Sequence, residues 1–464
     1  MLNRLLSVAL PLKGCLTGGV VLAVLVTSGC ATYKEAPLEP ESLSGVWQNR
    51  RTQVDPRLAQ NDTLTLGEEE LERIGLLLNP ELHHARLEAG VAEASAQEAG
   101  RWADPVLSLD ALRILDPEVG QNPRLYGAGL SFTLPLSGRL EVEKAEANAR
   151  KAAALVEVWK AEQSFKQELS VALSQLRWEL EKEQILQRDL VEWEEIQTVS
   201  EKLVEAGELL PGDGALFEST LLEAQLAVQI QANRVQLQRQ HLTALMGLSP
   251  QVSLMLKPRV ESVTPREEIS FNIVEIAQRN PEVRIAEATY RVTEENLRLA
   301  IREQYPDLEL GPIFEREDGQ DRLGLGVSVP LPLWNANRRV IAERDAERRA
   351  ARAVWESALH RAEAELTALQ AEHQTTSILL QRISESLVPI AESRYIKTRE
   401  LISAGEMNSL MLLDSLIARR EAALQMAETR FQLQELEAEY RYLLPQEPNE
   451  QIPTDQRDTP ENES

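Results

Sequence analysis

Few residues of this 464-residue chain have the types and spacing that catalysis or metal binding requires. His83 and His84 are adjacent, so on a helix their side chains point in different directions and do not form a metal site. Met407 and Met411 are four residues apart and could contact a soft metal ion, but packing explains the same spacing. The sequence contains no nucleophile motif, P-loop or dinucleotide fingerprint. We therefore predict no enzymatic activity, no metal site and no bound cofactor.

Cys30 is the residue whose surroundings predict a covalent modification. Residues 1–29 begin with positive charge and continue with a short apolar stretch, which is typical of an export signal. The signal ends in Val-Thr-Ser-Gly-Cys, which resembles a bacterial lipobox, although Thr27 stands where that pattern prefers Leu. We expect Cys30 to be acylated; cleavage of an ordinary signal nearby is the alternative. Loss of the signal also removes Cys15, which leaves no second cysteine for a disulfide.

The charge balance excludes one class of partner. Asp and Glu number 74 against 49 Lys and Arg, and the net charge is −25. A protein that binds nucleic acid carries a basic footprint, so we predict no nucleic-acid partner. The acidity has two interpretations that the sequence leaves open: solubility of long charged helices, or a surface that favours cations.

One short stretch occurs twice. Residues 127–136 read GAGLSFTLPL and residues 324–333 read GLGVSVPLPL, and Asn-Pro-Glu at 79–81 returns at 280–282. The repeat divides the chain into halves at 64–250 and 270–444, joined by a linker at 251–269. Residues 30–63 precede the first half and are expected to be extended. Residues 445–464 are rich in Pro, Glu, Asn and Asp and are expected to be disordered.

Each half is predicted to contain a strand pair followed by a long helical hairpin. The second strands, 126–134 and 323–331, alternate apolar with small or polar residues. Residues 140–206 lack proline and glycine and predict a helix, with a return helix to 246; residues 337–403 and a return helix to 444 repeat this plan. No segment after the signal is apolar enough for a transmembrane helix. Four strands cannot close a barrel in lipid, so closure would need two or three copies of the chain.

The order and duplication of these motifs resemble the TolC-like bacterial outer-membrane efflux proteins over residues 64–444. The shared features are Asn-Pro-Glu near each helix start, Pro-Leu after each second strand, and the Gly-Glu turns at 207–208 and 405–406. The stretch at 330–337, PLPLWNAN, looks most like the CzcC-like heavy-metal branch. The resemblance implies a mainly α fold with a β-barrel part. Long helical hairpins would form a periplasmic tunnel, and four strands per chain would enter a 12-stranded barrel in a homotrimer.

The same resemblance implies function and partners. The protein would be the outer-membrane duct of a tripartite export system, docked to a periplasmic adaptor and an inner-membrane pump of the RND type. It would sit in outer-membrane lipid, anchored at Cys30, because Ala31 is not the Asp that retains enterobacterial lipoproteins in the inner membrane. A periplasmic coiled-coil scaffold lipoprotein is the alternative, although a spacer does not need the duplicated amphipathic strands.

The resemblance also assigns site residues at the tunnel tip. Asp414 falls on one acidic position of the pore constriction, Met411 falls on the other, and Glu218 is the counterpart of Asp414 in the first half. Carboxylates repeated by symmetry around a narrow pore would attract cations; a solvated helix face is the alternative. The turn residues Gly207, Glu208, Gly405 and Glu406 would either contact the adaptor or serve only turn geometry.

Overall fold

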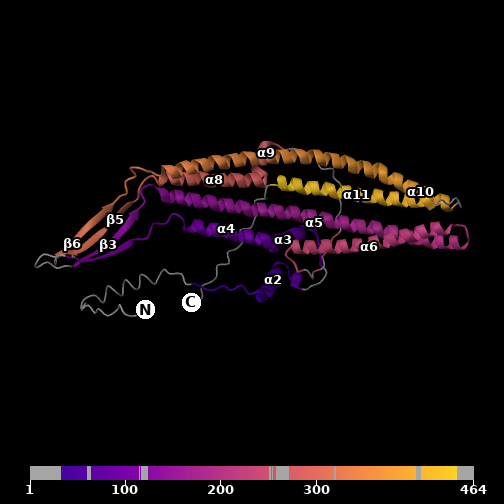
Figure 1. The fold of residues 1–464 in the computed structure, drawn as a ribbon, viewed down its shortest axis with the longest axis horizontal. Coiled ribbons are helices and arrows are strands. Elements are labelled where there is room, and N and C mark those ends of the chain that lie inside the picture. The colour runs from indigo at the N-terminus through magenta and orange to yellow at the C-terminus, as the bar shows by residue number, and fades with distance from the viewer. Residues whose placement is uncertain are drawn as a thin grey trace.

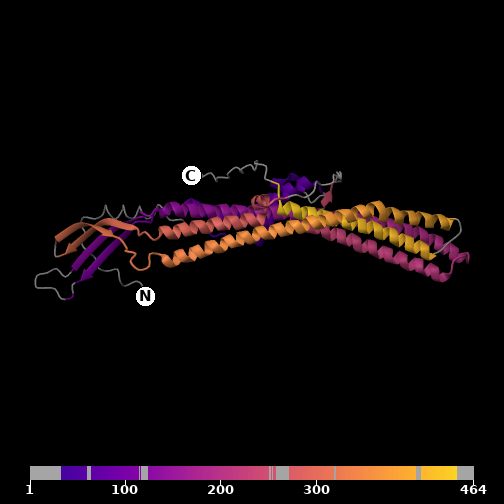
Figure 2. The ribbon, with the colours of Figure 1, turned by 90° about the horizontal axis from the view of Figure 1, so that it is seen from above.

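A computed structural model describes residues 33–59, 64–113, 115, 124–249, 252, 254–257, 271–317, 320–403 and 409–446. The molecule is long and narrow, with a β-sheet at one end and helices running from it to the opposite end (Figures 1 and 2). Cys30, Gly405 and Glu406 lie outside the described residues, as do the signal at 1–29 and most of the linker and of the C-terminal tail.

The long helices form where the sequence predicts them. Helix α5 covers Arg139–Glu205 and α6 covers Pro211–Leu245. At about 1.5 Å per residue, α5 is about 100 Å long. In the second half, α9 covers Arg338–Arg382 and α11 covers Ser409–Leu443.

A π-helical turn interrupts the expected helix at 337–403. The turn, η2, covers Ile383–Leu387 and leads into α10 at Val388–Ser403. Pro389 explains the interruption: a proline lacks the N–H of the helical ladder, and its ring clashes with the carbonyl four residues earlier. A wider turn of backbone relieves that clash.

Four shorter helices lie along α5 and α9. They are α3 (Glu68–Leu78), α4 (Pro80–Glu98), α7 (Ile273–Arg279) and α8 (Pro281–Arg302). Each pair breaks at an Asn-Pro step, and the Asn caps the following helix: Asn79 Oδ1 accepts from the N–H of Leu82 at 2.9 Å, and Asn280 Oδ1 from the N–H of Val283 at 3.1 Å. Proline at the first helical position fits because that residue needs no intrahelical N–H bond.

The sheet has four antiparallel strands in the order β2-β3-β5-β6. These are Val106–Arg113, Arg124–Leu134, Leu308–Glu317 and Gln320–Ser328. The last strand lies three residues earlier than predicted: it begins at Gln320 and ends at Ser328, because Pro330 cannot donate to a strand ladder. Strand β3 joins the two halves by pairing with β5.

The register gives the sheet two chemically different faces. Partners across the ladder share a face, and the pairs Leu109–Ala128, Ala128–Phe314 and Phe314–Leu323 carry one apolar row across all four strands. The opposite face has mainly small or polar residues, with Gly127, Gly129 and Ser131 on β3, and it also has Val106 and Ile313. Much of the apolar face is exposed in the single chain: Leu109, Leu323 and Leu325 are 74%, 82% and 69% exposed. Among the described residues, no helix is long and apolar enough to cross a membrane.

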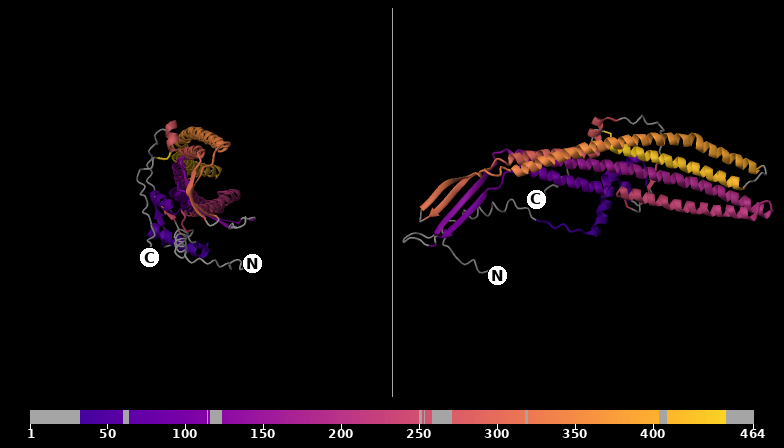
Figure 3. Two further views of the ribbon diagram at one scale, coloured as in Figure 1. Left: turned by 90° about the vertical axis from the view of Figure 1, so that its left-hand side faces the viewer. Right: turned by 45° about the horizontal axis from the view of Figure 1, so that its top comes forward.

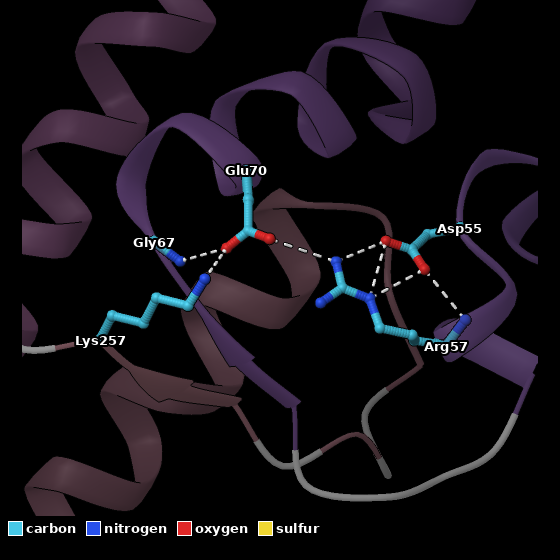
Figure 4. A network of polar contacts seen from close by, with 5 residues as sticks. All are labelled: Asp55, Arg57, Gly67, Glu70 and Lys257. Carbon is cyan, nitrogen blue, oxygen red and sulfur yellow. Dashed lines mark hydrogen bonds and ion pairs between the residues drawn. The ribbon is translucent and has the colours of Figure 1, made fainter.

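A small two-stranded sheet, which we call the belt, lies beside the middle of the helices (Figure 1). Strand β1 (Leu64–Leu66) pairs in parallel with β4 (Leu254–Leu256), which forms within the expected linker. A polar network closes the belt (Figure 4). Glu70 Oε2 accepts from Lys257 Nζ at 2.6 Å and from the N–H of Gly67 at 2.9 Å, while Arg57 bridges Asp55 and Glu70.

The expectation of an extended segment at 30–63 is wrong for its central part. Residues Pro40–Val54 form helix α2, followed by a short 3-10 turn, η1, at Pro56–Ala59. Helix α2 has no buried residue and lies beside the middle of the long helices (Figures 1 and 3). It lacks the apolar stripe by which sequence reasoning recognises a packed helix. Hydrogen bonds of Arg50 and Arg51 and the packing of Val54 against a hydrophobic cluster hold its last turns.

Three separate hydrophobic clusters among the described residues stabilise the helices. The first surrounds the belt and includes Leu71, Phe165 and Leu242; the second, between α7, α8, α9 and α11, includes Ile276 and Leu366. The third lies near the tip. This spacing of cores along the length, in place of one central core, follows from the narrow shape.

Candidate functional site

The predicted site residues that the structure describes gather at the end of the helices far from the sheet. There α5 turns into α6, and α10 approaches the start of α11 (Figures 1 and 2). Gly207 and Glu208 are in the first turn, Glu218 follows on α6, and Met411 and Asp414 are on α11.

The first turn is a Schellman motif that requires its glycine. Gly207 has φ +72°, its N–H donates to Val204 O at 3.1 Å, and the N–H of Glu208 donates to Leu203 O at 2.9 Å. Both turn residues are exposed. The geometry accounts for Gly207 by itself, and adaptor contact at this turn stays a prediction.

A buried aromatic cluster holds the four helices together just behind the turns. Trp193 of α5 and Phe217 of α6 are each 1% exposed, and their rings lie 6.5 Å apart. Tyr395 of α10 and Leu416 of α11 complete the cluster. Because Phe217 points inward, the next residue, Glu218, is directed outward, and it is exposed.

The two predicted acidic residues differ in their electrostatic surroundings. Asp414 forms an ion pair with Arg394 of α10; the side chains are 65% and 49% exposed, so the pair is worth at most about 1 kcal/mol. Glu218 has no ion pair or hydrogen bond with any residue in the described ranges. The structure therefore leaves the Glu218 charge uncompensated and partly neutralises that of Asp414.

Sequence reasoning missed Arg394, although a signal was present. Arg394 and Asp414 lie equally far in sequence from Ala404, and such residues face each other across a helical hairpin. Matching the turn at 206–208 to that at 404–406 puts Ile196 where the second half has Arg394. Ile196 packs against the aromatic cluster instead. That difference explains why only Asp414 has a cation beside it.

Met411 lines an exposed groove. The side chain is 46% exposed, and the groove, of about 670 Å³, runs along α10 from η2. Arg394 and Lys397 also line it, together with the apolar Ile390 and Leu401. The groove is open and combines charged residues, which include Glu385, with an apolar floor, so it is not an enclosed ligand site.

A second set of charges, not predicted, joins α5 to α10 and α11 beside the aromatic cluster. Asp189, 4% exposed, accepts from Trp193 Nε1 at 3.1 Å and pairs with Arg420 at 3.2 Å. Arg419 pairs with Glu192, and its guanidinium lies 4.0 Å from the centre of the Tyr395 ring. Burial, followed by the nearby Glu192 charge, raises the pKa of Tyr395 above its usual value. These pairs fix α11 against α5 close to Asp414.

Comparison with solved structures places this geometry in a known architecture. The chain is similar to the outer membrane protein VceC of Vibrio cholerae, with 16% identity, a TM-score of 0.67, and coverage of 86% of this chain and 97% of that one. It is also similar to the MtrE outer-membrane channel of Neisseria gonorrhoeae in its open state, with 17% identity, a TM-score of 0.65, and coverage of 81% and 88%. The CmeC outer-membrane channel of Campylobacter jejuni gives 14% identity, a TM-score of 0.66, and coverage of 90% and 94%.

The chain has the TolC-like outer-membrane channel fold. No family model and no curated protein matches it. The likeness covers 97%, 88% and 94% of the three matched chains. In this fold, Glu218 and Asp414 both lie at the end of the helices opposite the sheet (Figure 1). Of the two, Asp414 has an ion-pair partner, Arg394.

Proposed function

We propose that this protein is the outer-membrane channel of a tripartite efflux system and acts as a homotrimer. The observation that carries the proposal is the similarity to outer-membrane channels over 86% and 90% of the chain for VceC and CmeC. In this proposal the sheet lies in the outer membrane, the helices form a periplasmic tunnel, and Cys30 carries a lipid anchor.

The chemistry of the sheet supports a membrane role and several copies. An apolar face on all four strands is costly in water but suits lipid, while the polar face would line a lumen. Within the part of the chain that the structure describes, the outer strands β2 and β6 each have one unpaired edge, and unpaired edges are not viable in lipid. Three copies would give twelve strands, which leave a lumen that eight strands would fill.

The helices also have surfaces suited to neighbouring copies. On α6, Leu222, Leu226 and Ile230 follow one another at four-residue spacing and are 56%, 58% and 56% exposed. Ile390, on the groove of α10, is 67% exposed. In a trimer these apolar side chains would be covered by adjacent copies, and Glu218, Asp414 and Met411 would be repeated around the axis at the constriction.

The tip residues support roles in the constriction and in docking. We infer that Gly207, Glu208, Gly405 and Glu406 meet a periplasmic adaptor, and that an RND-type pump supplies the energy, so that the channel itself catalyses no reaction. Carboxylates around the axis favour cations. Heavy-metal cations are the substrates that the CzcC-like stretch at 330–337 suggests.

Conductance in planar bilayers tests the duct. Mature protein with Asp414→Ala and Glu218→Ala should form trimers, seen by native mass spectrometry, and should conduct ions. Glu223→Ala is the matched control, because Glu223 is exposed on another face of α6. If trimers form no pore even with both tip carboxylates removed, the channel proposal is refuted and the periplasmic scaffold lipoprotein is the remaining interpretation. For the substrate, a deletion strain that loses resistance to drugs but not to metals would refute the heavy-metal assignment.

A further inference from the structure

The helix ends in the middle of the molecule are capped differently in the two halves. In each half, the Asn before the proline donates its side-chain N–H to the last carbonyl of the return helix. Asn79 Nδ2 donates to Leu245 O at 2.9 Å, and Asn280 Nδ2 to Leu443 O at 3.1 Å. We call these two contact regions the first joint and the second joint.

In the second joint, the neighbouring arginine completes the cap. Arg279 Nε donates to Pro445 O at 2.7 Å, and its Nη2 donates to Leu444 O at 3.2 Å. Glu275 Oε1 forms an ion pair with Arg279 Nη1 at 3.0 Å, which orients the guanidinium. The last carbonyls of a helix lack partners within the helix and carry negative partial charge, so a guanidinium is a well-matched cap.

The first joint has no arginine at the corresponding position. Leu78 precedes Asn79 there, and its side chain is 5% exposed within the hydrophobic cluster of the belt. The same joint concentrates carbonyls, because the ends of α3 and α6 meet: a Cβ added to Gly247 would lie 2.5 Å from Leu78 O. The positive φ of Gly247, +65°, and this contact leave glycine as the residue that fits.

Two arginines of α2 supply what the joint lacks. Arg51 Nε donates to Gly247 O at 3.1 Å, and Arg50 Nη2 donates to Leu77 O at 2.8 Å. Gly247 lies two residues after the last residue of α6, as Pro445 does after α11, so the same carbonyl of each joint receives the same guanidinium atom. The donor comes from the adjacent residue in one half and from a separate N-terminal helix in the other.

We propose that α2 is a brace for the first joint and that Arg51 is a positioning residue for the end of α6. The contacts around α2 agree with this role. No residue of the helix is fully buried; its last residue, Val54, packs against the belt cluster, and the arginines make its hydrogen bonds to the joint. Just beyond it, Leu58 enters the belt cluster at 5% exposure and Arg57 bridges Asp55 and Glu70. The segment is therefore fixed next to the joint and delivers its arginines there.

The brace makes the order of the first joint depend on the segment that follows Cys30. Helix α6 runs from the tip turn to this joint, so the joint holds the end of α6 that is distant from the tip. The second joint is independent of α2, since Arg279 and Glu275 belong to α7 itself. The two joints therefore provide internal controls for each other.

Hydrogen exchange measured by mass spectrometry on the full-length protein tests the brace. In Arg51→Met, exchange at 242–249 should rise about tenfold or more, which corresponds to about 1.4 kcal/mol, while exchange at 440–446 stays unchanged. Arg279→Met should give the reverse pattern. Gln53→Met, an exposed change on α2, should alter neither region. Arg51→Lys should restore part of the protection, because it keeps a cationic donor.

Three results would overturn the proposal. One is unchanged exchange at 242–249 in both Arg51→Met and the double variant with Arg50→Met. Another is an equal rise at both joints, which would indicate general destabilisation. The third is the same rise in Gln53→Met as in Arg51→Met. None of these exchange measurements depends on conductance. The brace can therefore fail while the channel proposal holds, and the reverse.

Discussion

The unequal surroundings of Glu218 and Asp414 predict unequal effects on ion selectivity. A carboxylate about 5 Å from a cation attracts it by about 0.8 kcal/mol in bulk-water dielectric, which is about a fourfold preference. Glu218 has no compensating cation among the described residues, whereas Arg394 cancels part of the Asp414 charge. We expect Glu218→Gln to reduce the cation-to-anion permeability ratio a few-fold, and Asp414→Asn to reduce it less.

Arg394 provides the decisive variant. Arg394→Gln exposes the Asp414 charge, so the permeability ratio should rise, opposite in direction to either carboxylate change. The measurement is the reversal potential of single channels in planar bilayers with unequal KCl on the two sides, at low salt to limit screening. Glu223→Gln serves as the control. If Arg394→Gln and Asp414→Asn shift the reversal potential in the same direction, the pair acts as a mechanical link and our electrostatic reasoning is refuted.

Three further predictions concern stability. Phe217→Ala should cost about 3–5 kcal/mol at the tip, because a fully buried ring is lost; hydrogen exchange of 190–220 should report it, and unchanged exchange would contradict the packing. Asp189→Asn should cost about 3 kcal/mol, since Arg420 loses its buried partner; a rescue by Arg420→Met would support that cause. The hydrogen bond from Lys257, followed by that from the Gly67 N–H, lowers the pKa of Glu70 from 4.5 to about 2, so its stabilising effect is complete above pH 4.5 and lost as the pH falls toward 2. Glu70→Gln should remove this pH dependence, measured as protease resistance of the belt between those pH values.

The features that the sequence predicted are those with a long, regular signal. Helix α5 was expected at 140–206 and covers Arg139–Glu205, because a run without proline or glycine and with an apolar repeat leaves little alternative. The strand pairs followed from alternation of residue types and from turn chemistry. Pro389 was visible in the sequence, yet the π-helical turn before it was not predicted.

Long-range polar contacts escaped sequence reasoning. The pairing of Leu64–Leu66 with Leu254–Leu256 involves three residues on each side, too few for a pattern, and their partners are far apart in the chain. Helix α2 was missed because it is held by one apolar residue, Val54, and by Arg50 and Arg51, which are indistinguishable in sequence from ordinary surface charges. For the predicted tip residues, the sequence indicated Asp414 and Glu218 but not that only one of them has a nearby cation.

The positions at which the two halves differ carry more information than those at which they agree. Asn79 and Asn280 make the same contacts, so this shared residue explains a joint that both halves need. At two positions the first half has an apolar residue where the second half has an arginine: Leu78 corresponds to Arg279, and Ile196 corresponds to Arg394. The missing arginine has a different consequence at each position. At the joint, α2 supplies the guanidinium that the first half lacks, so both joints have the same carbonyl capped. At the tip no described residue restores it, and the Glu218 charge stays uncompensated. A charge whose neutralisation is dispensable for the fold is available to act on ions, which makes Glu218, rather than the better-placed motif residue Asp414, the stronger candidate for selectivity.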